Sequence, residues 1–161
     1  MHNVYLALGT NLGDRIENLR RAVAALPPIL RVTALSSAYE TPPWGYANQS
    51  AFLNMALAGE TESSPSDLIA FLKSLESELG REKTFRNGPR LIDMDILFYD
   101  DLRVDEPGLV IPHPRLHQRA FVLVPLNDIA PDLIHPELGR AIRDMLKDVD
   151  TKGVNFHGRI D

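Results

Sequence analysis

The sequence contains no cysteine among its 161 residues. A disulfide scaffold, a thiolate metal site and a cysteine nucleophile are therefore all excluded. No apolar run approaches the roughly 18 residues that a membrane-spanning helix requires. Residues 1–5 also do not form a basic segment followed by a long apolar stretch. We therefore expect a cytoplasmic protein with no signal peptide and no membrane partner.

Several common motifs of nucleotide binding and catalysis are missing as well. Residues 9–14, Gly-Thr-Asn-Leu-Gly-Asp, lack the lysine of G-x-x-x-x-G-K-[ST] and do not match G-x-G-x-x-G. The sequence has neither H-E-x-x-H nor G-x-S-x-G. We interpret residues 9–14 as a tight turn between a strand and a helix. If the protein binds ATP, it does so without a P-loop.

The composition is that of an ordinary globular protein, with 44% hydrophobic and 24% charged residues. A length of 161 residues favours a single domain over residues 1–161. The net charge of −5 argues against a general nucleic-acid partner, because such proteins are usually basic. Nothing in the sequence requires a dimer, so we expect a monomer.

Hydrophobic spacing and turn residues predict the order of the elements. A helix is expected from Asp14, an acidic cap, to Pro27, and another from Ser64 to Gly80. Strands are expected over residues 4–8, 29–39, 52–58 and 91–99, and short helices over residues 119–126 and 141–149, with a ribbon after Asp100. This order predicts an α+β, ferredoxin-like βαββαβ core with an antiparallel sheet and helices on one face.

Two carboxylates, Asp93 and Asp95, alternate with Met94 on the last predicted core strand. Side chains alternate across a strand, so both acids should point to the same side. A divalent cation would relieve their repulsion, and oxygen ligands suit magnesium. A solvated acid pair on an exposed sheet face is the alternative.

The segment before this strand, residues 81–90, is positively charged, whereas the whole chain is negatively charged. It contains Arg81, Lys83, Arg86 and Arg90 but only one acid, Glu82. Guanidinium groups beside a magnesium site are suited to the oxygens of a polyphosphate. A solvated basic loop is the alternative, and the neighbouring acid pair weakens it.

A second group of residues could bind a flat heterocycle. Trp44 follows two prolines, Asn54 offers a paired donor and acceptor, and Phe121 could supply a ring face for stacking. Each could equally be a packing residue. His113, between two prolines, could donate to a phosphate or serve only as a polar loop residue. Glu76 could pair with Arg81 or lie near a ligand.

Residues 86–97, Arg-Asn-Gly-Pro-Arg-Leu-Ile-Asp-Met-Asp-Ile-Leu, resemble the signature of the 6-hydroxymethyl-7,8-dihydropterin pyrophosphokinase family. The resemblance covers about residues 4–136 and departs at Asn87, where many members carry tryptophan. It includes further blocks at residues 7–13, 36–45, 52–54, 80–81, 111–113, 119–121 and 129–131.

The resemblance implies transfer of the β,γ-diphosphate of ATP to a pterin hydroxymethyl group in folate synthesis, with release of AMP and no covalent intermediate. It implies that Asp93 and Asp95 hold two Mg²⁺ ions and that Arg81 and Arg90 stabilise the reacting phosphate. The residues implied at ATP are Glu76, Lys83, Arg86, Ile96, His113 and Arg119. Those implied at the pterin are Thr41, Pro42, Pro43, Trp44, Phe52, Asn54 and Phe121.

Two other functions remain as alternatives. A ferredoxin-like RNA-binding module would require exposed aromatic residues on the sheet and a basic face. An inactive relative that only senses pterin is the second, although the chain retains Asp93, Asp95, Arg81 and Arg90.

Overall fold

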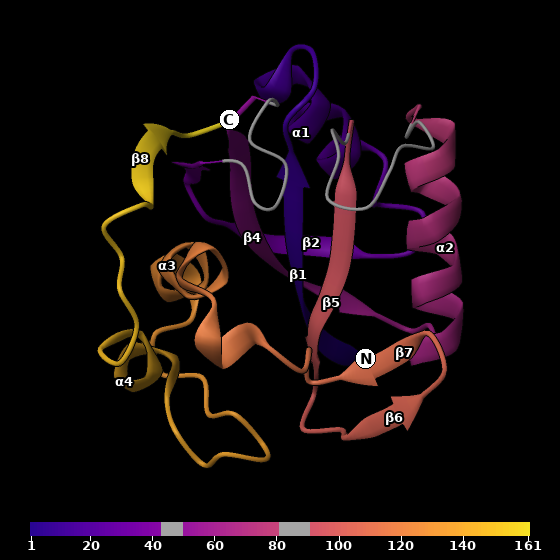
Figure 1. Cartoon of the computed structure of the whole chain (residues 1–161). Coiled ribbons are helices and arrows are strands. Elements are labelled where there is room, and N and C mark those ends of the chain that lie inside the picture. Colours follow the sequence, from indigo (N-terminus) through magenta and orange to yellow (C-terminus); the bar gives the residue numbers. More distant parts are fainter. Residues whose placement is uncertain (43–49, 81–90) are drawn as a thin grey trace.

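The computed structural model describes residues 1–42, 50–80 and 91–161 (Figure 1). The described residues form a six-stranded sheet with the order β5-β1-β4-β3-β8, and β2 also pairs with β4. These strands are β1 (His2–Thr10), β2 (Arg31–Leu35), β3 (Ala38–Thr41), β4 (Phe52–Thr61), β5 (Asp93–Tyr99) and β8 (Asn155–Gly158). Every pairing in this sheet is antiparallel. The α+β, ferredoxin-like arrangement expected from the sequence is confirmed.

The two long helices begin at the residues that the sequence indicates. The Asp14 side chain accepts from the Glu17 amide at the start of α1 (Arg15–Ala24). The Ser64 side chain accepts from the Asp67 amide at the start of α2 (Pro65–Glu78), which has proline in its first turn. Such caps satisfy amide groups that have no partner within the helix. The two caps therefore fix where α1 and α2 begin, a few residues after the ends of β1 and β4.

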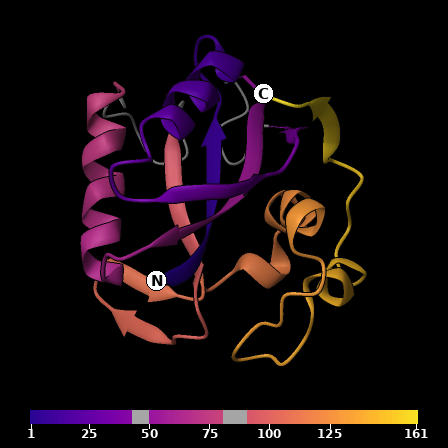
Figure 2. The same cartoon turned by 180° about the vertical axis from the view of Figure 1, so that it is seen from behind.

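The sheet carries a hydrophobic core on each face. One core packs the β1 residues Leu6 and Leu8 against Leu19 of α1 and Leu72 of α2. On the opposite face, Leu123 belongs to a second cluster, with residues of α3 (Ala120–Ile129), α4 (Ile142–Leu146), β4 and β5. Figures 1 and 2 show α2 at one side of the molecule and α3 and α4 at the other. The expectation of helices on a single face therefore holds for the two core helices, α1 and α2, and the additional helices α3 and α4 cover the other face.

Residues 29–39, expected as one strand, form two strands that both pair with β4. Two serines interrupt the run. The Ser36 hydroxyl accepts from the Ala56 amide at 2.8 Å, and the Ser37 amide donates to Asp128 of α3 at 3.2 Å. Such side-chain bonds compete with the regular ladder. The Tyr39 hydroxyl also donates to Asp128, at 2.8 Å, so α3 is tied to β3.

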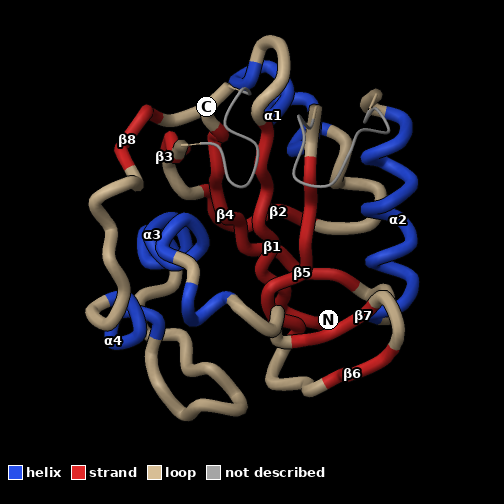
Figure 3. The backbone as a smooth tube through the Cα atoms, viewed as in Figure 1, coloured by secondary structure: helices blue, strands red, loops and turns tan. Residues whose placement is uncertain are grey.

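The last residues of the chain complete the sheet, although the sequence suggested no role for them. β8 pairs with β3 at the edge of the sheet (Figure 3). Ile160 is only 3% exposed and belongs to the first core, and its carbonyl accepts from Arg20 of α1 at 2.6 Å. The C-terminal segment is therefore an integral part of the fold.

The expected ribbon after Asp100 is present as β6 (Val104–Glu106) and β7 (Leu109–Ile111). A short 3-10 helix, η1 (Leu116–Gln118), leads from this ribbon into α3.

Within the described ranges, no helix combines the length and the apolar character needed to cross a membrane.

Candidate active site

The floor of the candidate site is a set of cross-strand rows on the α3 face of the sheet. Gly9 of β1 pairs with Asp93 of β5 on one side and with Asn54 of β4 on the other. One row along, Ala7 lies between Asp95 and Ala56. Gly9 and Ala7 have little or no side chain, so they leave space above β1 between the side chains of β5 and those of β4. A Cβ atom added to Gly9 would lie 3.0 Å from Asn54 Oδ1, which is tighter than most packing contacts.

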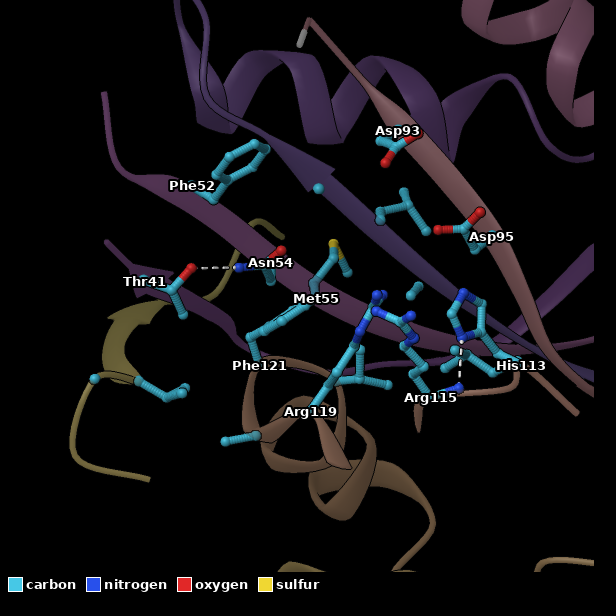
Figure 4. A pocket seen from close by; sticks show the side chains of 18 of the residues that line it. Thr41, Phe52, Asn54, Met55, Asp93, Asp95, His113, Arg115, Arg119 and Phe121 are labelled. Atoms are coloured by element: carbon cyan, nitrogen blue, oxygen red, sulfur yellow. Dashed lines mark hydrogen bonds between the residues drawn. The ribbon is translucent and has the colours of Figure 1, made fainter. Parts of the chain in front are cut away.

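The acid pair has the orientation that strand alternation predicts. Asp93 and Asp95 are half-buried and line the same cavity, and Figure 4 shows both carboxylates on one side of β5. The alternating Met94 is 0% exposed and belongs to the first core on the other face. The two carboxylates are thus available to one ligand.

Ile96, expected near ATP, follows the same alternation and does not reach this cavity. It is 4% exposed and packs in the first core. Its side chain is therefore on the wrong face for the cavity, and only its backbone could contact a ligand there. Glu76 is 2% exposed and accepts from the Met94 amide at 2.7 Å. Both assignments to ATP stay predictions.

A cationic wall faces the acid pair across the cavity. His113, Arg115 and Arg119 line it, and Figure 4 shows their side chains converging on the space in front of Asp95. The His113 amide donates to the Leu97 carbonyl at 3.1 Å, which fastens this loop to β5. The Arg115 amide donates to His113 Nδ1 at 3.4 Å. The loop therefore presents the imidazole and both guanidinium groups from a defined backbone.

The three residues of this wall differ in their charge near pH 7. Burial, followed by the charge of Arg119, lowers the pKa of His113 to about 4, although Asp93 acts in the opposite direction. His113 is therefore neutral near pH 7. Burial and then Arg115 also lower the pKa of Arg119 from its usual value. A guanidinium remains charged under all ordinary conditions, so the positive charge of the wall comes from the arginines.

The other end of the cavity suits a flat heterocycle. Thr41, Pro42, Phe52, Asn54 and Phe121 all line it, and the cavity has a volume of about 550 Å³. Asn54 Nδ2 donates to Thr41 Oγ1 at 2.9 Å (Figure 4). This bond fixes the direction of the Asn54 amide.

Phe121 joins the two ends of the cavity. Its ring lies beneath the Arg119 guanidinium, with 5.6 Å from Arg119 Cζ to the ring centroid. The positively charged Arg119 guanidinium therefore lies against the face of the Phe121 ring, which a cation–π interaction favours. This arrangement places the aromatic end next to the charged end.

The remaining predicted site residues lie outside the described residues. They are Pro43, Trp44, Arg81, Lys83, Arg86 and Arg90. Their assignments stay predictions. Across residues 1–42, 50–80 and 91–161, no group of three or more histidines and acids could hold a metal ion. Magnesium usually takes one or two carboxylates together with substrate phosphates, so a carboxylate pair fits it without a larger group.

Several cavity residues were missed by the sequence analysis. Arg115 lies two residues after His113, directly after Pro114, and this proximity could have indicated it. Asp150, Gly153 and Val154 of the C-terminal segment also line the cavity. A Cβ atom on Gly153 would lie 3.7 Å from Pro42. No local pattern could have indicated these three, because pairing between β8 and β3 brings them there.

A carboxylate pair facing arginines is suited to a polyphosphate with magnesium, and the aromatic recess beside it is suited to a flat heterocycle. Comparison with known proteins agrees. The profile of the 7,8-dihydro-6-hydroxymethylpterin-pyrophosphokinase family matches residues 5–131. The chain belongs to this family, and it is therefore an ATP-using pyrophosphokinase of pterin and folate metabolism.

The similar proteins include some of about this length and some that are much longer. The chain is 45% identical over 156 residues to the 2-amino-4-hydroxy-6-hydroxymethyldihydropteridine pyrophosphokinase of Methylorubrum extorquens, covering 96% of this chain and 98% of that protein. It is 46% identical over 132 residues to the enzyme of the same name from Bacillus subtilis, covering 80% of this chain and 79% of that one. Against the folic acid synthesis protein FOL1 of Dictyostelium discoideum it is 45% identical over 135 residues, but these are 84% of this chain and only 20% of that protein.

Solved structures support the fold. The Plasmodium falciparum HPPK-DHPS wild type with pterin and p-hydroxybenzoate matches with a TM-score of 0.73 and 19% identity, covering 92% of this chain and 42% of that one. At this identity the likeness concerns the fold alone. It agrees with the antiparallel sheet and the helices described above.

Proposed function

We propose that this protein transfers the β,γ-diphosphate of ATP to the hydroxymethyl group of 6-hydroxymethyl-7,8-dihydropterin in a magnesium-dependent step. The observation that carries the proposal is the shared cavity. Asp93 and Asp95 line one end of it, and Phe52, Asn54 and Phe121 line the other. The hydroxymethyl group of a pterin stacked at the aromatic end would point toward the charged end. One continuous site is therefore proposed for both substrates.

Asp93 and Asp95 are the residues that would hold magnesium, because two oxygen ligands on one strand face suit this ion. Bound Mg²⁺ would neutralise charge on the triphosphate oxygens. Arg115 and Arg119 face these acids from the opposite wall and would contact the same phosphates. Arg81 and Arg90, from the segment outside the described residues, are proposed to add positive charge at the β-phosphorus. The two expected Mg²⁺ ions remain part of this proposal.

The reaction is proposed to be a direct displacement. The pterin hydroxyl oxygen forms a bond to the β-phosphorus, the bond from that phosphorus to the AMP oxygen breaks, and the hydroxyl proton is released. Positioning and charge stabilisation supply the catalysis. Asn54 is suited to read the edge of the pterin because an amide offers both a donor and an acceptor. Phe121 is suited to stack on its ring.

Incubation with ATP and the hydroxymethyl pterin tests this function. AMP should form only when both substrates and Mg²⁺ are present. AMP formation without the pterin, or no AMP at all, would contradict the proposal, and pterin binding without turnover would favour the sensor alternative. Tight binding of single-stranded RNA in calorimetry would favour the RNA-binding alternative. The monomeric state and the cytoplasmic location expected from the sequence stay predictions.

A further inference from the structure

The strand that carries the acid pair is the end strand of the described sheet. β5 pairs with β1 on one side, and its other side faces α2. The outer side of an end strand leaves peptide groups without partners from the sheet. Such a strand is held less firmly than a central one. Some other element must therefore fix the backbone between Asp93 and Asp95 if the two carboxylates are to keep their geometry.

Two side chains of α2 supply this support at Met94. Glu76 Oε2 accepts from the Met94 amide at 2.7 Å. Lys73 Nζ donates to the Met94 carbonyl at 3.2 Å. Both polar groups of the residue that separates the two acids are therefore bound by one helix. Lys73 and Glu76 are three residues apart, so they lie on the same face of α2.

The two supporting side chains also interact with each other. Lys73 Nζ lies 3.4 Å from Glu76 Oε1, and it lies 3.9 Å from Asp95 Oδ1. Glu76 is 2% exposed, whereas the Lys73 side chain is 47% exposed. A buried carboxylate is costly unless hydrogen bonds and an opposite charge compensate it. Here the Met94 amide and the Lys73 ammonium both contribute to that compensation.

We propose that Lys73 and Glu76 are positioning residues that hold the Met94 peptide and thereby set the spacing and direction of Asp93 and Asp95. This inference rests on the proposed role of the two acids in binding magnesium. Groups that orient metal ligands typically change metal affinity or activity by about 10–100-fold when removed. In this role Glu76 acts on the two acids through the backbone of β5, and not through the direct ATP contact that the family resemblance implies.

The variants separate these two roles. Glu76→Met removes the acceptor for the Met94 amide, whereas Glu76→Gln keeps an oxygen that can accept from it. Lys73→Met removes the donor to the Met94 carbonyl from a half-exposed position, so this variant is expected to fold. Glu78→Met, an exposed acid on the same helix, is the matched control.

The measurement is the binding of a non-hydrolysable ATP analogue by calorimetry over a series of Mg²⁺ concentrations, which also works for inactive variants. Glu76→Met should raise the Mg²⁺ concentration for half-maximal binding by about tenfold or more. Lys73→Met should raise it by a smaller factor, because loss of the Met94 contact is partly offset by removal of a positive charge 3.9 Å from Asp95 Oδ1. Glu76→Gln and Glu78→Met should stay near the wild type. Hydrogen exchange at the Met94 amide should become faster in Glu76→Met.

Asp95→Asn distinguishes failure of this inference from failure of the proposed function. If Asp95→Asn raises the Mg²⁺ requirement but Lys73→Met and Glu76→Met do not, the positioning role is wrong and the metal site stands. If none of the three raises it, the metal site itself is wrong. If Glu76→Met weakens analogue binding equally at all Mg²⁺ concentrations, Glu76 acts by direct ATP contact. Should Glu76→Met fail to fold, an unchanged Mg²⁺ requirement together with unchanged hydrogen exchange at the Met94 amide in Lys73→Met overturns the inference.

Discussion

At the scale of single residues, the direction of the Asn54 amide is set by its bond to Thr41. We expect Asn54→Ala to weaken binding of the hydroxymethyl pterin by about 5- to 150-fold, because leaving a polar group of the ligand without its partner costs about 1–3 kcal/mol. Binding of the ATP analogue should be unchanged. Calorimetry with each ligand separately measures both. An equal loss for both ligands would show that Asn54 supports the fold of the site rather than the pterin.

His113 makes a prediction about pH. Its pKa is lowered from 6.5 to about 4, with burial and Arg119 as the main causes. The unfolded chain therefore takes up this proton before the folded protein does, and stability is lost as pH falls from about 6.5 to about 4. His113→Gln removes this contribution. The free energy of unfolding should thus fall less between pH 7 and pH 4.5 in the variant than in the wild type.

Urea denaturation at several pH values checks this difference. His157→Gln is the control, because His157 is exposed on β8. Arg115, Lys73 and Asp93 also act on His113, and all three remain in the variant. Identical pH dependence in His113→Gln and the wild type would contradict the buried, neutral histidine.

At the scale of elements, the C-terminal strand links the fold to the cavity wall. Ile160→Ala should lower the free energy of unfolding by about 2–5 kcal/mol, because it removes a fully packed aliphatic side chain. Phe156→Ala is the matched control, since Phe156 on β8 is 68% exposed and should contribute little. Chemical denaturation compares them. Equal, small effects of both substitutions would show that the C-terminal segment does not support the core.

Elements whose signals are local could be predicted, and those that depend on distant partners could not. The starts of α1 and α2 follow from Asp14 and Ser64, whose caps are contacts over three residues. The break at Ser36 and Ser37 depends on Ala56 and Asp128, which no local pattern reveals. β8 was missed for the same reason, since its partner β3 lies more than a hundred residues earlier.

The same distinction applies to the site. Strand alternation predicted that Asp93 and Asp95 share a face, and the same alternation places the Ile96 side chain away from the cavity. The role of Lys73 was not predicted, because its contact with Met94 depends on how α2 packs beside β5. Glu76 was noticed, but its hydrogen bond to the strand backbone could not be read from the sequence.

At the scale of the whole molecule, the cavity is built from segments that lie far apart in the sequence. β1 and β4 supply the floor, β5 the acids, and the segment leading into α3 the arginines. The C-terminal segment closes the aromatic end. An antiparallel sheet thus brings residues from both halves of the sequence to one face. The proposed function depends on magnesium binding to Asp93 and Asp95 on that face.

The most direct test is Asp95→Ala assayed for AMP formation with ATP, the hydroxymethyl pterin and a range of Mg²⁺ concentrations. We expect a folded protein whose turnover is reduced by at least about a thousandfold, because a metal ligand is lost where phosphate charge must be neutralised. Circular dichroism and the melting temperature serve as controls of the fold. Near-normal turnover with an unchanged Mg²⁺ requirement in this variant would contradict the account.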